Sequence, residues 1–510
     1  MPANSLIKAV KVAALCMIAL CLCATMLLTL KWPLVGDASI IHYIVFLSAH
    51  GFKPYVDVVD PNFPGSYAVD WLVMHVYGQG SLAWRLFDYT LLLLTMALMA
   101  GITYPVELFS GIYAAMLFAM VHFRDGIDQA GERDLTMTVL LLAFFLIASR
   151  AGRAKSVFAA CASGIFIGAA ISIKPTAALF LVVPLVFSEG SHGAQTKYSA
   201  RGMVTFFIGM VAPWIAVITF LVHEHGVHAF FLSLNYLDRS HASLSRLGVW
   251  TLFTHSIPSY LLPLLILCLV IASSRREVWA QRKYRAICLA AIAGLASFML
   301  QGKGYPYHRY PLLAFFLLAA VIILTAAIRA GGPLRWAALV GLVWCGAWIA
   351  PVCMYKAIHY DSNDQRFNTA LSRDLSGMGS LSGQIQCFDT TAGCINTLYD
   401  MRLVQSTGMI YDCYLFHDGS SGYIKKIQSG FIKELQSAPP RVLVVSNQYC
   451  LSGPNGYSKL SRWPELKNFI NKNYKMYKDE KVRENQLVHW WSEPRIPLTF
   501  RIYVLKQKTL

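Results

Sequence analysis

Residues 311–328 read PLLAFFLLAAVIILTAAI, an unbroken apolar stretch without a charged side chain. About 20 such residues are enough for a helix to cross the hydrocarbon core of a bilayer. Comparable stretches recur along the chain as far as residue 355. We predict eleven membrane-spanning helices, at residues 9–30, 81–103, 106–122, 135–149, 156–173, 175–188, 202–222, 256–273, 286–301, 307–328 and 334–355. The first fold prediction is therefore a polytopic α-helical membrane domain over residues 1–355.

The composition of the 510 residues leads to the same class. Hydrophobic residues make up 56% and charged residues only 14%, and the mean hydropathy is +0.48. The surface of a soluble domain needs roughly a quarter of its residues charged. These values exclude a soluble enzyme, a disordered chain and a coiled coil. We assign the net charge of +17 to basic loops and a basic tail, because no zinc-ligand spacing indicates nucleic-acid binding.

Basic residues fall between alternate spans, which predicts the orientation of the chain. With eleven spans and the N-terminus in the cytoplasm, the cytoplasmic loops carry Lys8, Lys11, Arg150, Arg153, Lys155, Lys197, Arg201, Arg275, Arg276, Arg282, Lys283, Arg285, Arg329 and Arg335. The opposite loops carry Asp37, Asp57, Asp60, Asp70, Asp125, Asp128, Glu132, Asp134, Glu224 and Asp238. Joining spans 156–173 and 175–188 into one helix broken at Pro175 would move every later loop to the opposite side of the membrane. The basic loop Arg275–Arg285 would then lie outside, so two spans are favoured. The first span is expected to stay as an uncleaved anchor.

The tail, residues 356–510, contains no further spanning stretch and predicts a small α/β domain. An odd number of spans places this domain outside the cytoplasm. We expect strands at 441–446 and 500–505 and amphipathic helices at 420–436 and 463–474. The cysteines of the tail allow two disulfides in three pairings, or four buried thiols; they are Cys387, Cys394, Cys413 and Cys450.

The first outer loop, residues 31–80, concentrates carboxylates, aromatics and prolines near the membrane surface. Asp37 follows the first span, where a carboxylate can act as a general base toward a hydroxyl within hydrogen-bond reach. The alternative is that Asp37 caps a helix predicted at 38–50. Asp60 lies further along the same loop, in the segment Asp60-Pro61-Asn62-Phe63-Pro64.

Two further clusters lie at the ends of later spans. Glu132, Arg133 and Asp134 open the fourth span. They are either an arginine–carboxylate pair that caps the helix, or a second acid beside an arginine that grips a phosphate. Lys174 lies between two apolar segments, where a lysine is costly. It either snorkels to the surface or neutralises a lipid phosphate.

The fourth cluster is the loop Gln301–Pro311, which contains Lys303, Tyr305, His308 and Arg309. Aromatic and basic side chains here suit either an interfacial belt or a lipid headgroup that carries phosphate and sugar. All four clusters fall on the same side of the predicted membrane. We therefore expect one outward-facing site of acids, cations and aromatics at the bilayer edge.

These motifs, in this order, resemble GT-C glycosyltransferases of the protein O-mannosyltransferase and lipid A aminoarabinose-transferase type. The resemblance covers nearly the whole chain. In the membrane domain it lies in Asp37, Pro54-Tyr55-x-Asp57, Glu132-Arg133-Asp134 and the loop from Gln301 to His308. In the tail, Phe388–Thr391, Gln405–Thr407 and Tyr411-Asp412 resemble uncharacterised bacterial members. The chain departs from the pattern in Gly36-Asp37-Ala38-Ser39, where the aminoarabinose branch often has an Asp-Glu pair, and in Asn62-Phe63, where relatives often have adjacent prolines.

The resemblance implies an enzyme of the bacterial cytoplasmic membrane that transfers a hexose or pentose from a polyprenyl-phosphate donor. The acceptor would be a lipid, glycan or protein of the cell envelope, and transfer would invert the anomeric carbon. The implied catalytic acids are Asp37 as the base, Asp60, and Asp134 or Glu132. The implied ligands of donor phosphate and substrate are Glu132, Arg133, Lys174, Lys303, Tyr305, His308 and Arg309. No ligand set demands a metal, and a divalent cation stays open as a cofactor. The alternatives are a transporter or flippase of lipid-linked glycans and a structural or assembly protein.

Overall fold

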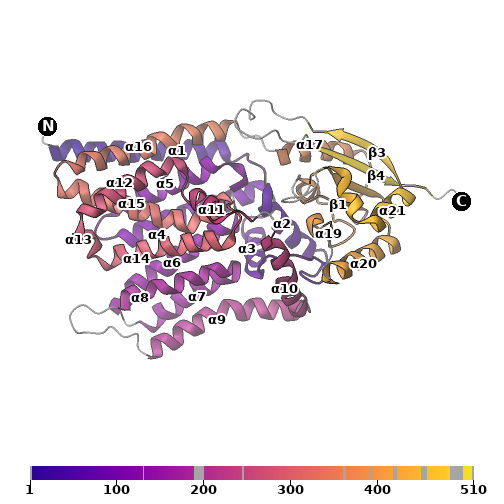
Figure 1. Ribbon diagram of the computed structural model, residues 1–510, viewed down its shortest axis with the longest axis horizontal. Helices are drawn as coiled ribbons and strands as arrows, with labels where there is room; N and C mark the ends of the chain where they lie inside the picture. Colours follow the sequence, from indigo (N-terminus) through magenta and orange to yellow (C-terminus); the bar gives the residue numbers. More distant parts are fainter. Residues whose placement is uncertain are drawn as a thin grey trace.

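The structure is a computed structural model that describes residues 3–129, 131–154, 156–188, 200–243, 246–359, 363–390, 392–416, 422–448, 456–482 and 498–507. Helices fill one end of the molecule, and a small sheet with its own helices lies at the other (Figure 1). The N-terminus is at the helical end and the C-terminus is at the sheet end. The described residues as far as Ile358, where α16 ends, therefore build a helical body, and the described residues that follow pack against one end of it.

Each predicted spanning segment is helical over most of its described residues, although 256–273 is interrupted at Ile257-Pro258 and 175–188 begins with a 3-10 turn. The long helices are α1 (Ala3–Thr29), α4 (Ser81–Thr103), α5 (Leu108–Asp125), α6 (Arg133–Ala154), α7 (Val157–Ile173), α9 (Ala200–His223), α12 (Leu262–Ser274), α14 (Arg282–Gln301), α15 (Tyr310–Ala330) and α16 (Leu334–Ile358). Among the described residues, six helices are long and apolar enough to cross a membrane, or seven if α11 (Val249–Ser256) and α12 form one bent span. Eleven crossings therefore stay a prediction.

The chain breaks at Lys174, as the sequence predicts. Helix α7 ends at Ile173, and Lys174 is extended, with φ −153° and ψ 120°. A 3-10 turn, η2 (Pro175–Val182), and the short helix α8 (Val183–Ser188) follow. Proline cannot donate the helical hydrogen bond, and its ring disfavours a helical conformation at the residue before it. The break leaves the Lys174 side chain at a helix end instead of on a helix face.

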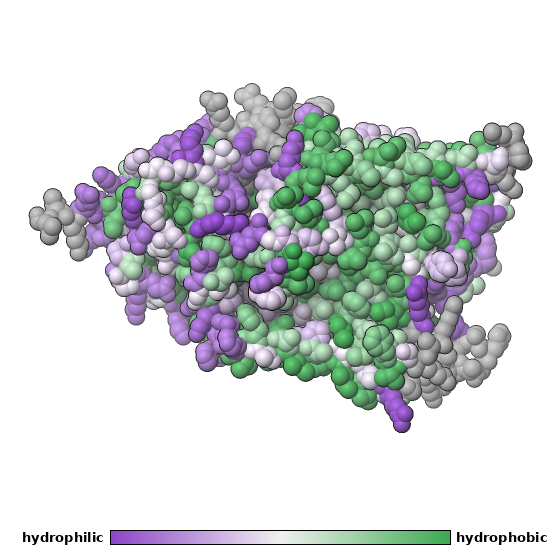
Figure 2. Space-filling model, turned by 180° about the vertical axis from the view of Figure 1, so that it is seen from behind, coloured by the Kyte–Doolittle hydropathy of each residue, from purple (hydrophilic) through white to green (hydrophobic). Residues whose placement is uncertain are grey.

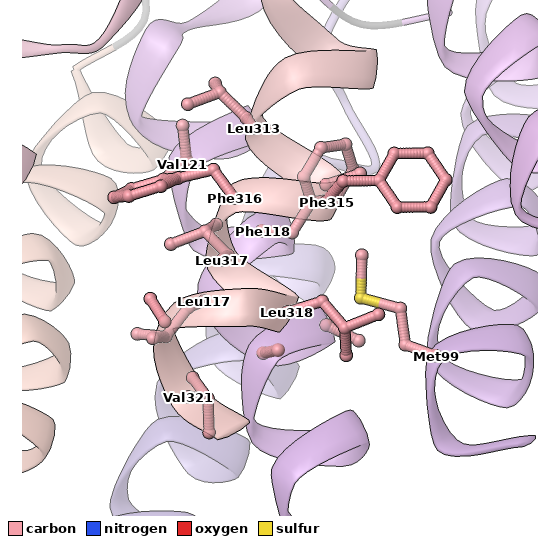
Figure 3. Close-up of a cluster of buried hydrophobic side chains, with 14 of the residues drawn as sticks. Met99, Leu117, Phe118, Val121, Leu313, Phe315, Phe316, Leu317, Leu318 and Val321 are labelled. Carbon is pink, nitrogen blue, oxygen red and sulfur yellow. The ribbon is translucent and has the colours of Figure 1, made fainter. Parts of the chain in front are cut away.

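Helix α15 is the centre of the helical body. Its side chains are buried all round, which is the pattern of a core helix. Figure 3 shows Leu313, Phe315 and Leu317 among side chains of α4 and α5, such as Met99 and Phe118. The outer helices expose large apolar side chains instead, and Figure 2 shows an apolar surface between two hydrophilic ends. This surface is the one expected of a protein surrounded by lipid.

Three shorter helices occupy the junction between the helical body and the tail (Figure 1). They are α2 (Gly36–Ser48), α3 (Pro64–Val76) and α10 (Val227–Ser243). Helix α2 overlaps the predicted helical stretch 38–50 but begins and ends two residues earlier, and it is buried along most of its length. It packs against α3 and against α18 (Cys394–Asp400) of the tail. The α2 segment of the first outer loop is therefore enclosed between α3 and the tail.

The tail contains a four-stranded sheet in the order β1-β2-β4-β3. The strands are β1 (Ile385–Phe388), β2 (Val442–Ser446), β3 (Tyr474–Lys481) and β4 (Thr499–Leu505). Strand β2 pairs parallel with β1 and antiparallel with β4, with Val444 opposite Ile502. The other helices are α17 (Asn363–Ser376), α19 (Asp412–Leu415), α20 (Gly422–Ser437) and α21 (Pro464–Asn473). Strands β2 and β4 and helices α20 and α21 match the expected elements. Strands β1 and β3 were not predicted, because β1 is four residues long and β3 is a polar edge strand.

One disulfide of the tail joins Cys387 and Cys394, across the turn between β1 and α18. Cys413 is disulfide-bonded as well. Cys450 lies outside the described residues. The cysteines of the helical body are free thiols. The prediction of disulfides in the tail, in place of buried thiols, is thus confirmed for three of its four cysteines.

Candidate active site

Asp37 lies in the first turn of α2 at the junction with the tail. Val35 occupies the N-cap position and no side chain caps this helix, so the capping alternative for Asp37 is wrong. The Asp37 carboxylate is half-buried, and its Oδ2 atom accepts a hydrogen bond from the Tyr307 hydroxyl at 2.8 Å. Tyr307 belongs to the turn η4 (Pro306–Arg309). The first and fourth clusters of the sequence therefore meet, as expected.

Arg133 reaches the first outer loop through Asn62. Its guanidinium donates to the side-chain oxygen of Asn62, and the Asn62 amide donates to Asp60 at 2.8 Å. Asp37 and Asp134 are among the negative charges that act on this guanidinium. Arg133 is thus held between the base candidate and the loop behind it, with its side chain half-buried.

Asp60 is fully buried, with a relative exposure of 0%. Its carboxylate accepts hydrogen bonds from the Tyr67 hydroxyl and from Asn62. Burial raises the pKa of the Asp60 carboxyl above its usual range, and hydrogen bonds from Tyr67 and Tyr411 act in the opposite direction. A carboxylate enclosed by these donors holds Asn62 and Tyr67 in place.

Tyr411 brings the tail into the site. The Asn62 amide donates to its hydroxyl at 3.2 Å, although the two residues are 349 positions apart. Asp37 and Arg133 also act electrostatically on this phenol. Tyr411 lies in a tail segment that carries the family resemblance, but the sequence does not predict it as a site residue. No local pattern could have placed it there, because its position depends on how the tail docks.

Glu132 is the most perturbed acid of the site. Its side chain is buried, and among the described residues its Oε2 atom has no hydrogen-bond partner. Burial raises the pKa of Glu132 well above its usual range, and the charges of Asp37 and Asp134 raise it further. Glu132 is thus a buried acid whose surroundings favour its neutral form.

Asp134 and Lys174 form a largely buried ion pair with each other. The Lys174 ammonium lies 2.8 Å from both carboxylate oxygens of Asp134 and donates to Gln301 Oε1 at 2.6 Å. The Asp134 side chain is fully buried, and that of Lys174 is 13% exposed. Lys174 therefore does not snorkel outward. The partner of Asp134 is this lysine and not Arg133.

The remaining candidates spread over the loop around η4. Tyr305 stacks on Tyr307 with ring centroids 5.6 Å apart, and His308 meets both rings edge-on. Arg309 forms an ion pair with Asp125 at 3.0 Å. Lys303 is buried and lies near the exposed Arg246, whose charge acts on it. The described structure thus groups Asp37, Tyr305, Tyr307 and Arg133 closely, and turns Arg309 toward a different acid.

A divalent cation does not fit the described donor set. No three His, Cys, Asp or Glu side chains in the described ranges come together as a metal site. The oxygens of Asp60 and Asp134 already accept hydrogen bonds from Tyr67, Asn62 and Lys174. We therefore derive no chemical step through a metal.

Gly131 sets the position of the loop that carries Glu132 and Arg133. Its φ is +76°, and a Cβ atom there would overlap the indole nitrogen of Trp84. We expect Gly131→Ala to lower the free energy of unfolding by about 1–2 kcal/mol for the left-handed backbone and by a further ~1–3 kcal/mol for overpacking. Thermal unfolding in detergent measures both.

The matched control is Gly126→Ala in the same loop. Gly126 also has a positive φ, +102°, but the nearest atom to its Cβ would be Lys356 Nζ at 3.5 Å. Gly126→Ala should therefore show the backbone cost alone. Equal losses for the two variants would mean that the contact with Trp84 does not constrain the loop.

Comparison with known proteins bears on the fold. No family model and no curated protein matches the sequence. The structure of ArnT from Cupriavidus metallidurans bound to undecaprenyl phosphate is 13% identical, with 95% of this chain and 97% of that chain covered and a TM-score of 0.56. The structure of the oligosaccharyltransferase of Archaeoglobus fulgidus in its apo form is 9% identical, with 93% of this chain and 80% of that chain covered and a TM-score of 0.52. Both neighbours are GT-C superfamily proteins, and at these identities the likeness shows that this chain shares their overall fold.

Proposed function

We propose that this chain is a glycosyltransferase that moves a sugar from a polyprenyl-phosphate donor to an acceptor of the cell envelope. The observation that carries the proposal is the position of Asp37. Its half-buried carboxylate lies among Tyr307, Arg133 and Glu132, at the junction of the helical body and the tail. An acid, a base and a cation at such a junction suit group transfer between a lipid-bound donor and a second molecule.

The choice of donor is supported by the neighbours of the fold. ArnT binds undecaprenyl phosphate, and the Archaeoglobus fulgidus oligosaccharyltransferase binds a dolichol-phosphate. We extend this chemistry to the present chain because Arg133, on which the charge of Asp37 acts, can place positive charge beside a phosphate. Lys303 adds a second cation four residues before Tyr307 in the sequence. An arginine fork suits phosphate oxygens especially well.

In the proposed reaction, Asp37 removes the proton from an acceptor hydroxyl as that oxygen attacks the anomeric carbon. The bond between the anomeric carbon and the phosphate oxygen breaks, and both of its electrons leave with the polyprenyl phosphate. Attack from the face opposite the leaving group inverts the anomeric carbon. The Asp37 hydrogen bond from Tyr307 orients the carboxylate for this transfer. The proton then passes from Asp37 to water.

Stabilisation of the leaving phosphate is the larger demand, because charge collects on it in the transition state. We assign this role to Arg133, held by Asn62, and to Lys303. We assign Lys174, Asp134 and Arg309 to the support of these loops, because their charges are engaged with each other or with Asp125. Tyr305 and His308 would line the sugar side of the site, and Asp60 would hold Asn62 and Tyr67 in place.

The orientation in the membrane is part of the proposal. The basic side chains Lys11 and Arg329 both pair with Glu107, at the turn between α4 and α5. Lys283 donates to the carbonyl of Ile102 close by. The segment that leads into Asp37 lies at the opposite end of α4, where Arg85 donates to the carbonyl of Trp32. Under the positive-inside rule, the site and the domain of residues 356–510 then face outward.

Native mass spectrometry of the purified protein tests the donor. We expect a bound polyprenyl-phosphate sugar, whose mass identifies the sugar, and release of polyprenyl phosphate when acceptor-containing membranes are added. A bound polyprenyl-pyrophosphate oligosaccharide that is carried across vesicles without chemical change would favour a flippase of lipid-linked glycans.

Donor binding should weaken above neutral pH. Burial, together with the charge of Arg246, lowers the pKa of Lys303 to about 8. The ammonium is therefore present below pH 8 and is lost as the pH rises through 8. We expect the affinity for undecaprenyl phosphate, measured in nanodiscs, to fall several-fold between pH 7 and pH 9.

Lys303→Met is the matching variant for this pH profile. It should bind undecaprenyl phosphate weakly at pH 7 and change little up to pH 9. A wild-type profile that is flat over the same range would remove Lys303 from the phosphate site.

A further inference from the structure

Two buried charges on α4 reach the loops on either side of the site. Arg85 and Asp88 are one helical turn apart, with relative exposures of 1% and 0%. Arg85 donates from Nε to the carbonyl of Trp32 at 3.3 Å and from Nη2 to the carbonyl of Pro33 at 3.1 Å. Pro33 lies four residues before Asp37. Arg85 thus fixes the backbone that leads into the base.

Asp88 holds the opposite loop. Its Oδ1 atom accepts a hydrogen bond from the backbone N–H of Gly131 at 2.9 Å. Its Oδ2 atom lies 3.0 Å from His122 Nε2 and 4.0 Å from Arg85 Nη1. Gly131 directly precedes Glu132 and Arg133. Asp88 therefore fixes the backbone that leads into the acid and the cation of the site.

A second contact braces this loop from the other side. The Tyr310 hydroxyl lies 2.7 Å from His122 Nδ1 and 3.5 Å from the carbonyl of Gln129. His122 therefore links Asp88 to Tyr310, and both of them touch the loop. Helix α15, through Tyr310, joins α4 in holding the segment before Glu132.

Buried ion pairs are costly, since their desolvation can exceed their attraction. The charged atoms of Arg85 and Asp88 are 4.0 Å apart, so the two side chains interact only weakly with each other. Their hydrogen bonds go instead to the backbone of two loops and to His122. This division is poorly suited to stabilising α4 itself. It is well suited to fixing the distance between two loops.

We propose that Arg85 and Asp88 are a positioning pair that sets the spacing between Asp37 and the Glu132-Arg133 segment. The inference rests on the proposed function of that site. Neither residue touches a substrate in this scheme. A small misplacement of reacting groups costs rate steeply, so a loss of this spacing should act on the site more than on global stability.

Hydrogen exchange by mass spectrometry tests the pair, on the full chain in nanodiscs with and without undecaprenyl phosphate. In the wild type, the lipid should slow exchange in peptides that cover residues 31–38 and 126–135. Asp88→Asn and Arg85→Lys should each speed exchange in both segments. Both variants should also raise the Kd for undecaprenyl phosphate about 10-fold. This is the lower end of the loss observed at metal sites when a group that orients a ligand is removed.

The decisive measurement is the exchange rate of residues 31–38 in the Asp88→Asn variant. Asp88 has no described hydrogen bond to residues 31–38, so faster exchange there in Asp88→Asn shows coupling through Arg85. Faster exchange in 126–135 alone would overturn the inference. Wild-type protein that the lipid fails to protect would instead overturn the proposed function.

Thr95→Val on α4 is the matched control. Thr95 is a buried polar residue whose hydroxyl, among the described residues, donates a hydrogen bond to the Leu91 carbonyl of its own helix and to no other helix. It should leave both segments unchanged. If Asp88→Asn does not fold, Tyr310→Phe removes one hydroxyl and should still speed exchange in 126–135. An unchanged Tyr310→Phe would contradict the bracing of this loop.

Discussion

Asp37→Asn is expected to lower sugar transfer about 10³-fold, within the range of contributions from a general base. The amide keeps the shape of the side chain and can still accept the hydrogen bond from Tyr307, but it cannot take a proton. Membrane vesicles from a deletion strain that carries the variant, supplied with labelled lipid-linked sugar, measure the rate of label transfer.

Asp57→Asn is the control for this experiment. Asp57 is an exposed carboxylate of the same outer loop, and its Oδ2 atom accepts only a local hydrogen bond from the Lys53 backbone. Transfer by this variant should equal that of the wild type. If Asp37→Asn were to transfer sugar at the wild-type rate, the assignment of the base would be wrong.

Lys174→Met is expected to cause the largest loss of stability in the helical body. The variant leaves the fully buried Asp134 carboxylate without its ammonium partner. Removing one member of a buried pair typically costs about 3–5 kcal/mol. The double variant Lys174→Met/Asp134→Leu should recover most of that loss, because it removes both charges. Unfolding of the purified protein in mixed micelles with increasing SDS measures the difference.

Lys478→Met provides the comparison with a partly exposed pair. Lys478 lies 2.7 Å from Asp374 on the surface of the tail, with its side chain 34% exposed. Such pairs contribute roughly 0–1 kcal/mol, so the loss should be small. A double variant that recovers stability and also transfers sugar would confirm Lys174 as support. A stable double variant without transfer would return Lys174 to the phosphate site.

The helical architecture could be predicted from the sequence because the signal is local. A stretch such as 311–328 has one physical outcome, a buried or membrane-embedded helix, and the structure forms α15 there. The break at Lys174 was equally local, since Pro175 imposes it. Which helices cross the bilayer is a different matter. Helix α7 and the segment after it fall below the length of a clear span, and their role depends on neighbours.

The site was predicted as a gathering of four clusters, and the meeting of Asp37 with Tyr307 and of Arg133 with the first loop agrees with that expectation. The partner of each charge was not predictable. Sequence spacing suggested Arg133 for Asp134, whereas Lys174 is the partner. Arg309 turned out to bind Asp125. Charge pairing is decided by the packing of distant helices, which a single sequence does not contain.

The docking of the tail has a consequence for the timing of activity. Asn396 donates to the carbonyl of Leu34 and accepts from Ser39, and the Tyr43 hydroxyl is tied to Leu403 and Gln405. Tyr411 then closes the site from the same side. Because synthesis proceeds from the N-terminus, the segment around Asp37 is made early, whereas Tyr411 is made only after the whole helical body. Under the proposed function and orientation, we therefore expect sugar transfer to begin only after the tail has been exported and has folded against α2.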